Sequence, residues 1–393
     1  MPNTRQTTII ELAKQLIAIP SYVDTGHDES ELVEFLYRFF RDNLPAIQLE
    51  KHYIDNSSRR SNLIGRGKNR PKLLVLGHID TVRPKANWLT PATTPTVKDG
   101  KLYGLGAADM KGSLAAFLWA LIDSNVALDD LMILLYCDEE YDFAGIKQFL
   151  KTEELVNNPP ELILSLDGSL ELASGCRGLI EFDARITGRS GHASNPSNGV
   201  NAITNTVRAV SALEQAIAAY SDEFLGPSTL NLAYLRGGTV EQKSDDIIWQ
   251  REGNVIPDYA DITLEFRTAQ TPLNADEAIR CLQAACKQHN LLVEVTNVRH
   301  DLAPWPVVSN SALTAMFKDC YQSAKIEFRE SDRTFSGFID TQMIVSKINT
   351  PAYILGTGGN NKHGANENVP LDNLSNAYEL YKSILKRTIG AKK

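Results

Sequence analysis

Hydrophobic residues in the first part of the chain follow two different spacings. Apolar residues recur with helical spacing, or form an alanine- and leucine-rich stretch of helical length, at residues 8–19, 30–40 and 110–123. Short apolar runs of strand length occur at residues 72–77, 131–137 and 161–166. Helices that alternate with strands in this way are typical of a mainly parallel sheet flanked by helices, so we predict an α/β fold for this part.

The pattern changes near residue 178. Residues 177–187 alternate apolar and polar side chains, as a half-buried strand does. Patterns of helix, strand, strand, helix and strand follow, at residues 200–220, 229–235, 260–268, 274–289 and 291–296. The resulting order β-α-β-β-α-β is that of a ferredoxin-like α+β unit.

The α/β pattern returns after the proline-containing stretch 303–306. A helix is predicted at 311–324, a strand at 352–355 and a helix at 371–385. We therefore expect two domains, a larger α/β domain of residues 1–177 and 299–393 and an inserted domain of residues 178–298.

The composition narrows the class of protein. A formal net charge of −8 leaves no basic surplus to neutralise phosphates, which argues against a nucleic-acid partner. The cysteines are odd in number and form no C-x-x-C pair, which favours free thiols in a reducing compartment. The longest apolar run, residues 114–122, is far below the ~18 residues of a membrane span. Glu11 and Lys14 interrupt the first helix, unlike a signal peptide, so we expect a soluble cytoplasmic protein.

Residues of the kinds that bind metal ions follow four of the apolar runs, and one more stands in a glycine-containing loop. They are His78, the acidic run 138–140, Asp167, His363 after a glycine-rich loop, and Asp109 in the loop 104–109. Open parallel sheets bind ligands at the carboxyl ends of their strands, so we expect these side chains to share one crevice.

This set of two imidazoles and several carboxylates fits two divalent ions, with a bridging carboxylate between ions about 3.5–4 Å apart. Without cations, so many carboxylates would repel one another and take up protons. Each residue also has an ordinary explanation: His78 as a polar loop residue, 138–140 as a solvated turn, and Asp109 as a helix cap. The residues by themselves leave both explanations open.

Several motifs resemble those of one known family. They are GHIDTV (77–82), GLGAADMKG (104–112), DEE (138–140), GHAS (191–194), GGT (237–239), NVIP (254–257) and HGANE (363–367). In this order they are similar to the dizinc amidohydrolases and exopeptidases that include acetylornithine deacetylase, succinyl-diaminopimelate desuccinylase, aminoacylase and glutamate carboxypeptidase. The resemblance spans almost the whole chain and implies a hydrolase of amide bonds whose inserted domain is a lid and dimerisation domain.

The resemblance implies a role for each residue of the crevice. His78 and His363 would each bind one metal ion, Asp109 would bridge the ions, Asp167 would complete the site of His78, and Glu140 that of His363. Glu139 would be the general base that takes a proton from metal-activated water and passes it to the leaving nitrogen. Asp80 would fix the imidazole of His78 from behind. The ions would be zinc, with cobalt or manganese fitting the same ligands.

The resemblance also assigns residues of the inserted domain. His192 would contact the transition state from the opposite subunit of a homodimer, and Asn254 and Arg267 would contact the substrate. The planar guanidinium of Arg267 suits a carboxylate of the substrate. The ordinary alternatives are a polar turn residue for His192 and a solvated ion pair with Glu265 for Arg267.

Three features depart from the family pattern. Residues 240–253 form an acidic and polar insertion between GGT and NVIP. Glu265 stands where an aspartate is common, and Lys362 precedes His363 where a small residue is usual. A lysine beside a metal ligand is unexpected and puts the geometry of that loop in question.

The leading hypothesis is a deacylase acting on a small N-acyl amino acid. A carboxypeptidase or dipeptidase with the same dinuclear site is the nearest alternative, and pocket shape decides between them. A non-catalytic metal- or peptide-binding homologue is a third possibility, against which Glu139 speaks, because metal binding does not need it. A nucleotide-binding protein fails for lack of a phosphate-binding loop.

Overall fold

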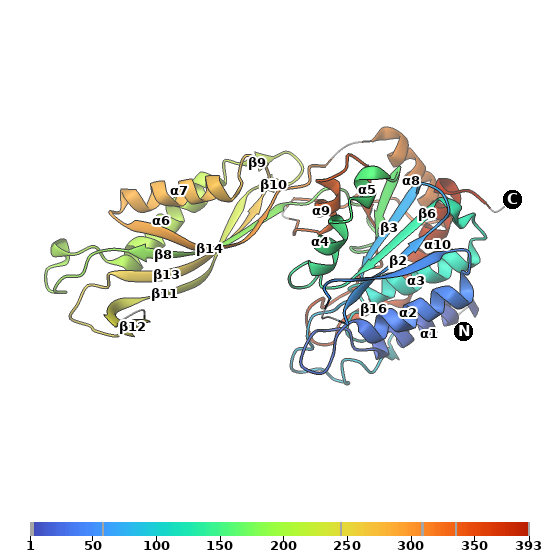
Figure 1. Ribbon diagram of the computed structural model, residues 1–393, viewed down its shortest axis with the longest axis horizontal. Coiled ribbons are helices and arrows are strands. Elements are labelled where there is room, and N and C mark those ends of the chain that lie inside the picture. The colour runs from blue at the N-terminus through green and yellow to red at the C-terminus, as the bar shows by residue number, and fades with distance from the viewer. Residues whose placement is uncertain (1–3, 57–58, 244–245, 308–309, 335, 392–393) are drawn as a thin grey trace. The chain divides into compact units, whose positions relative to one another are not determined.

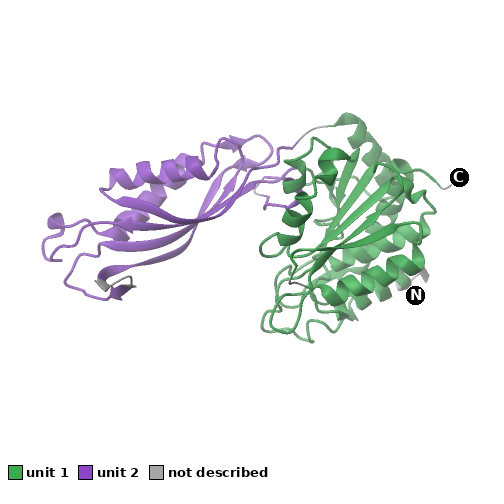
Figure 2. Cartoon of the chain, in the orientation of Figure 1, with its two compact units in different colours: residues 1–174, 308–331, 343–393 green, residues 175–307, 332–342 purple. Residues whose placement is uncertain are grey.

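The computed structural model describes residues 4–56, 59–243, 246–307, 310–334 and 336–391. Its chain forms two compact units, coloured separately in Figure 2: unit 1 contains residues 1–174, 308–331 and 343–393, and unit 2 contains residues 175–307 and 332–342. The expected domain boundaries at 178 and 298 lie within the first segment of unit 2, and residues 332–342 cluster with that unit although the sequence pattern had placed them in the larger domain.

Unit 1 is built on a six-stranded sheet of order β1-β2-β6-β3-β7-β15. The strands are β1 (Gln48–Tyr53), β2 (Ser61–Arg66), β6 (Leu131–Tyr136), β3 (Leu73–His78), β7 (Leu162–Ser165) and β15 (Ala352–Ile354). The last four in this order run parallel, whereas β1 and β2 pair antiparallel at one edge. The predicted mainly parallel sheet is confirmed, whereas the β1–β2 hairpin was not predicted from the sequence.

Both faces of this sheet are covered. Leu73 and Val75 of β3 share a core cluster with residues of helices on one face, namely α1 (Thr4–Ala18), α2 (Ser30–Asn43), α3 (Lys111–Asp123), α8 (Ser311–Ala324) and α10 (Leu371–Thr388). Leu74 and Leu76 are equally buried but lie outside that cluster, on the other face. In Figure 1 the short helices α4 (Ala144–Leu150) and α5 (Glu154–Asn157) lie on that side. A strand buried on both faces is a continuous apolar run, which is why the sequence shows runs there.

A small antiparallel sheet joins two distant segments of unit 1. Its order is β16-β5-β4, from Asn368–Pro370, Lys101–Tyr103 and Thr96–Lys98. Asn368 pairs with Tyr103, so the end of the HGANE motif lies beside the start of the loop that carries Asp109. The remaining short elements of the chain are η1 (Leu128–Asp130), η2 (Pro196–Asn198), β9 (Ser221–Asp222), β10 (Gly226–Pro227) and α9 (Thr341–Val345).

Unit 2 contains a five-stranded antiparallel sheet of order β12-β11-β13-β8-β14. Its strands are β8 (Gly178–Thr187), β11 (Thr229–Lys243), β12 (Asp246–Gln250), β13 (Tyr259–Thr268) and β14 (Leu292–Leu302). Helices α6 (Ala202–Ile217) and α7 (Ala275–Gln288) pack on one face and share its core. Both helices begin after an asparagine, Asn201 or Asn274, whose side chain accepts backbone N–H groups. The expected ferredoxin-like order is confirmed.

The insertion at residues 240–253 is an extension of this sheet. β11 continues to Lys243, and β12 returns alongside it as an edge strand, with Val240 paired to Trp249. The Arg236 guanidinium lies 4.7 Å from the centre of the Trp249 ring, which ties the hairpin to the main part of β11. Residues 244–245 lie outside the described residues.

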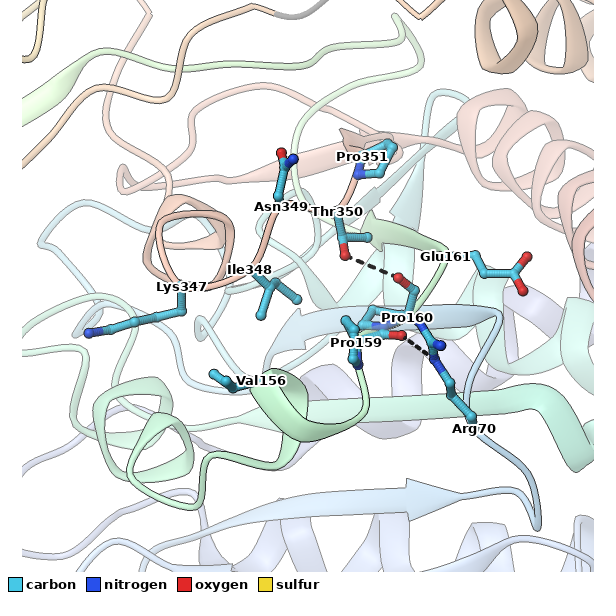
Figure 3. Close-up of a pocket in the computed structure, with 10 residues that line it drawn as sticks. All are labelled: Arg70, Val156, Pro159, Pro160, Glu161, Lys347, Ile348, Asn349, Thr350 and Pro351. Atoms are coloured by element: carbon cyan, nitrogen blue, oxygen red, sulfur yellow. Dashed lines mark hydrogen bonds between the residues drawn. The ribbon is translucent and has the colours of Figure 1, made fainter.

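A pocket of about 570 Å³ opens in unit 1 beside the amino ends of β7 and β15. Its lining includes Arg70, Pro160 and Lys347, and Arg70 donates a hydrogen bond to the Pro159 carbonyl oxygen (Figure 3). Because metal-type residues follow the carboxyl ends of these strands, this pocket lies at the opposite end of the sheet from them. In the part of the chain that the structure describes, no helix is long and apolar enough to cross a membrane.

A buried ion-pair network fixes the start of the loop after β6. The Arg60 guanidinium donates to both carboxylate oxygens of Glu29, at 2.6 and 2.7 Å, and to Asp138 Oδ1 at 2.5 Å. Glu29 is fully buried and Asp138 almost so. Asp138 also accepts the N–H of Ala144 at 3.1 Å. One arginine therefore holds the residue next to Glu139, and neutralises charge that burial would otherwise make unfavourable.

Arg60→Ala should destabilise the protein by about 3–5 kcal/mol, because Glu29 and Asp138 would be left buried without their cation. The neighbouring Arg59 is the matched control: it is 78% exposed and pairs with Asp28 at 3.1 Å. Arg59→Ala should cost about 0–1 kcal/mol. Urea unfolding followed by circular dichroism measures both. Equal losses of unfolding free energy in the two variants would contradict the stabilisation assigned to the buried network.

Candidate metal centre

The ligand-type residues of the sequence lie where the topology of unit 1 predicts. His78 ends β3, the acidic run 138–140 follows β6, and Asp167 follows β7. β6, β3 and β7 are neighbours in the sheet, so their carboxyl ends form one edge. The loop after β15 brings His363 to the same edge, and the loop before α3 brings Asp109.

Asp109, Glu140 and His363 form one group of converging ligand atoms, all within 4.8 Å of one another. His363 Nε2 lies 2.9 Å from Glu140 Oε2 and 3.6 Å from Asp109 Oδ2. The Glu140 side chain is only 4% exposed, whereas that of His363 is 55% exposed. One imidazole and two carboxylates are a sufficient set of protein ligands for a divalent ion such as zinc.

His78, Glu139 and Glu140 form a second such group. His78 is buried, and its Nε2 lies 3.2 Å from Asp109 Oδ1. On the other side of the ring, Nδ1 lies 3.2 Å from the Asp80 carbonyl oxygen and 3.6 Å from Asp80 Oδ1. Asp80 Oδ2 accepts the N–H of Glu140 at 3.0 Å. Asp80 thus lies behind His78, with its main-chain carbonyl oxygen nearest to Nδ1, and its carboxylate supports Glu140.

The carboxylates dominate the electrostatics of this edge. Burial by itself lowers the pKa of His78, but hydrogen bonds to Asp109 and Asp80 outweigh it and raise that pKa well above its usual value. Hydrogen bonds to Asp109 and Glu140 raise the pKa of His363 to about 10. Burial opposes ionisation of Asp109, yet Lys362, His363 and His78 lower its pKa well below the ordinary range. The surplus negative charge of the neighbouring carboxylates therefore raises the pKa of both imidazoles.

Lys362 lies within this group of carboxylates. Its Nζ atom is 3.3 Å from Asp167 Oδ1 and 3.4 Å from Asp109 Oδ2. Among the described residues, neither group of converging ligand atoms includes Asp167. The expected pairing of Asp167 with His78 is therefore not seen, and Asp167 is instead in contact with an ammonium group.

Glu367 is a residue of the site that the sequence analysis missed. Its carboxylate is buried and accepts the N–H groups of Gly106 at 2.8 Å, Ala108 at 2.8 Å and Asp109 at 2.9 Å. Burial raises its pKa to about 7, against the effect of these bonds. Glu367 therefore fixes the backbone of the loop that carries Asp109. The motif HGANE contained the residue, but a carboxylate that binds backbone N–H groups has no pattern of its own.

Lys111, in the motif after Asp109, is also buried, and its Nζ donates to the Ile19 carbonyl oxygen at 2.8 Å. Burial lowers its pKa to about 7. This contact ties the start of α3 to the chain segment that follows α1.

The three remaining candidate residues lie in unit 2. His192 is exposed, and its Nδ1 is 2.7 Å from Ser194 Oγ. Ala193 donates to the Asn254 carbonyl oxygen at 2.9 Å, so the GHAS and NVIP motifs are adjacent in space. Arg267 Nε donates to Glu265 Oε1 at 2.8 Å, which is the ion pair named above as its ordinary explanation. The side chain of Arg267 is 31% exposed.

Comparison with known proteins places the chain in a family. Residues 74–387 match the pattern of peptidase family M20/M25/M40. The chain is 33% identical over 248 residues to the acetylornithine deacetylase of Proteus mirabilis (strain HI4320), which covers 60% of this chain and 64% of that protein. It is 35% identical over 243 residues to that of Pectobacterium carotovorum subsp. carotovorum (strain PC1), covering 58% and 62%. The chain thus spans less than two-thirds of the length of these curated relatives.

Solved structures share the fold over nearly the whole chain. A tripeptidase from Staphylococcus aureus subsp. aureus Mu50 superposes with a TM-score of 0.76 at 21% identity, covering 98% of both chains. A dinuclear metal-binding peptidase of the M20 family from Bacillus subtilis has a TM-score of 0.66 at 15% identity, covering 98% of this chain and 99% of the other. With a matching pattern across most of its length, this chain belongs to peptidase family M20/M25/M40.

Proposed function

We propose that this protein is a divalent-metal-dependent hydrolase that cleaves the amide bond of a small N-acyl amino acid. The observation that carries the proposal is the convergence of Asp109, Glu140 and His363 within 4.8 Å, beside a second group that contains Glu139. Similarity to acetylornithine deacetylases supports an N-acyl amino acid as the substrate.

The donor set fits a metal centre. It combines imidazole nitrogens with carboxylate oxygens, the ligands that zinc, cobalt and manganese accept. We assign the ions to the residues expected from the sequence: Glu140 and His363 would hold one ion, His78 and Asp167 would hold the other, and Asp109 would contribute to both. Zinc is the expected metal, and similarity to the Bacillus subtilis peptidase described as dinuclear supports a pair of ions.

Divalent ions supply Lewis-acid chemistry when bound, since they acidify water and polarise an amide carbonyl. Glu139 is the proposed general base, which takes the proton of the attacking water and delivers it to the leaving nitrogen, a contribution of roughly 10²–10⁴ in rate. His78 Nδ1 faces the Asp80 carbonyl oxygen, which can only accept, so the ring donates there and keeps its Nε2 lone pair on the side of Asp109. Glu367 holds the Asp109 loop in place.

A carboxypeptidase or dipeptidase is the second candidate. It is supported by the similarity in fold to the Staphylococcus aureus tripeptidase and to human carnosine dipeptidase 1, which has a TM-score of 0.65 at 15% identity and covers 98% of this chain and 97% of its own. The same metal centre would serve either reaction, because a deacylase and a peptidase both hydrolyse an amide bond. Three further expectations stay predictions. They are a homodimer in which His192 acts across the interface, a contact of Asn254 with the substrate, and a cytoplasmic location. The mass of the protein in solution tests whether the homodimer forms.

Removal of metal should abolish activity. Protein dialysed against a chelator is expected to lose hydrolysis of N-acetyl and N-succinyl amino acids and of dipeptides, and to regain it with zinc, cobalt or manganese. Elemental analysis at saturating metal should find about two ions per chain. Full activity in a sample that elemental analysis finds free of metal would refute the proposed function, and the preferred substrate decides between deacylase and peptidase.

Glu139→Gln should lower kcat by roughly 10²–10⁴ and leave metal content unchanged, because Glu139 is assigned to proton transfer. Glu140→Gln is the matched variant of the adjacent residue. It should weaken metal binding, because the Glu140 carboxylate is assigned as a metal ligand together with His363, which it contacts. Metal titration and steady-state kinetics separate the two effects. A loss of metal in Glu139→Gln with none in Glu140→Gln would reverse the assignment of the pair.

The substrate should need a free carboxylate. We expect Arg267 to bind that carboxylate, and Arg177 supplies a second positive charge near it. Arg177 donates a hydrogen bond to Thr229, the residue that pairs with Arg267 in the sheet. Burial and the charge of Arg267 lower the pKa of Arg177. Amidating the substrate carboxylate should lower kcat/KM by about ten- to a hundredfold. Arg267→Ala should lose a similar factor on the acid and almost nothing on the amide. Equal cleavage of acid and amide by the unaltered protein would contradict the assignment.

A further inference from the structure

Lys362 brings a positive charge into the group of carboxylates at this edge of the sheet. Its ammonium is in contact with both Asp109, at 3.4 Å, and Asp167, at 3.3 Å. These two carboxylates are the ones proposed to belong with His78 to one of the two metal positions. An ammonium has three N–H donors and no acceptor, so it satisfies carboxylate oxygens in the way that a metal ion would.

The two proposed metal positions differ in how completely their ligand atoms converge. Asp109, Glu140 and His363 already converge as a complete group of ligand atoms. Asp167 belongs to no such group among the residues that the structure describes, and the lysine ammonium lies between its carboxylate and that of Asp109. The position that needs Asp167 therefore holds a positive charge supplied by the chain itself.

A divalent ion and this ammonium cannot use the same oxygens. A metal ion bound to Asp109 and Asp167 would displace the ammonium from them, and like charges a few ångströms apart repel strongly where water is scarce. The Lys362 side chain is 35% exposed, so solvent is available to the ammonium once it leaves the carboxylates. A lysine stem is long and flexible, which makes that movement possible without a change in the fold.

We propose that Lys362 is a tethered cation that competes with the second metal ion for Asp109 and Asp167. The inference rests on the proposed function, of which it specifies one property. The first ion binds at Asp109, Glu140 and His363, and the position with His78 and Asp167 is filled only when the ammonium leaves. Metal binding then occurs in two unequal steps, and the chain balances part of the negative charge of the site before the second ion enters.

The test is a calorimetric titration of metal-free protein with zinc. In the unaltered protein the second ion should bind at least about tenfold more weakly than the first, because it has to displace a charge. Lys362→Met removes the charge but keeps most of the stem. It should tighten the second step by about ten- to a hundredfold, and the first step, which uses Asp109 but not Asp167, by a smaller factor. Lys362→Gln is the second uncharged variant, in case the methionine variant does not fold.

Two controls separate competition from other effects. Lys362→Arg keeps a positive charge and should keep the second step weak. Lys347→Met removes a lysine from the pocket at the other end of the sheet and should leave both steps unchanged. If two ions bind but the uncharged variants leave the second step as weak as before, the role of Lys362 is refuted and the proposed function stands. If neither the unaltered protein nor the variants bind metal, the proposed function itself fails.

Discussion

The surplus of carboxylates at one edge of the unit 1 sheet is the constraint on which the site depends. Parallel strands bring their carboxyl ends to the same edge, and in this chain those ends and their loops carry Asp80, Asp109, Glu139, Glu140 and Asp167. Gathered acidic groups that are shielded from water are stable only with positive charge nearby. The chain supplies some of it through His78, His363 and Lys362, whose contacts with these carboxylates are all short. Divalent ions would supply the rest.

Much of the fold can be predicted from the sequence, because hydrophobic spacing reports burial directly. Buried strands such as β3 and β6 appear as apolar runs, and the helices of unit 2 as periodic patterns with asparagine caps. The edge strands cannot be predicted in this way. β1 alternates exposed and half-buried residues, and β12 lies in a polar insertion, so neither has a strong apolar pattern. Their pairing is decided by neighbouring strands, which the local sequence does not contain.

The candidate site could be predicted in the same partial way. His78, Asp109, Glu140 and His363 could be inferred because their residue types and their places after strands both point to metal binding. The supporting residues could not. Glu367 acts through three backbone N–H groups, and Arg60 acts through two buried carboxylates far away in the sequence. The contact of Lys362 with Asp167 likewise depends on where two loops meet, although the unusual residue type at that position was visible.

Anomalous diffraction from crystals of the zinc-loaded protein tests the central claim most directly, because it locates the ion instead of inferring it from activity. The account predicts an anomalous peak at the zinc edge within about 2.0–2.3 Å of ligand atoms of Asp109, Glu140 and His363. A zinc peak that lies only at other carboxylates or histidines, with these three side chains still converging on one another through hydrogen bonds, would contradict it.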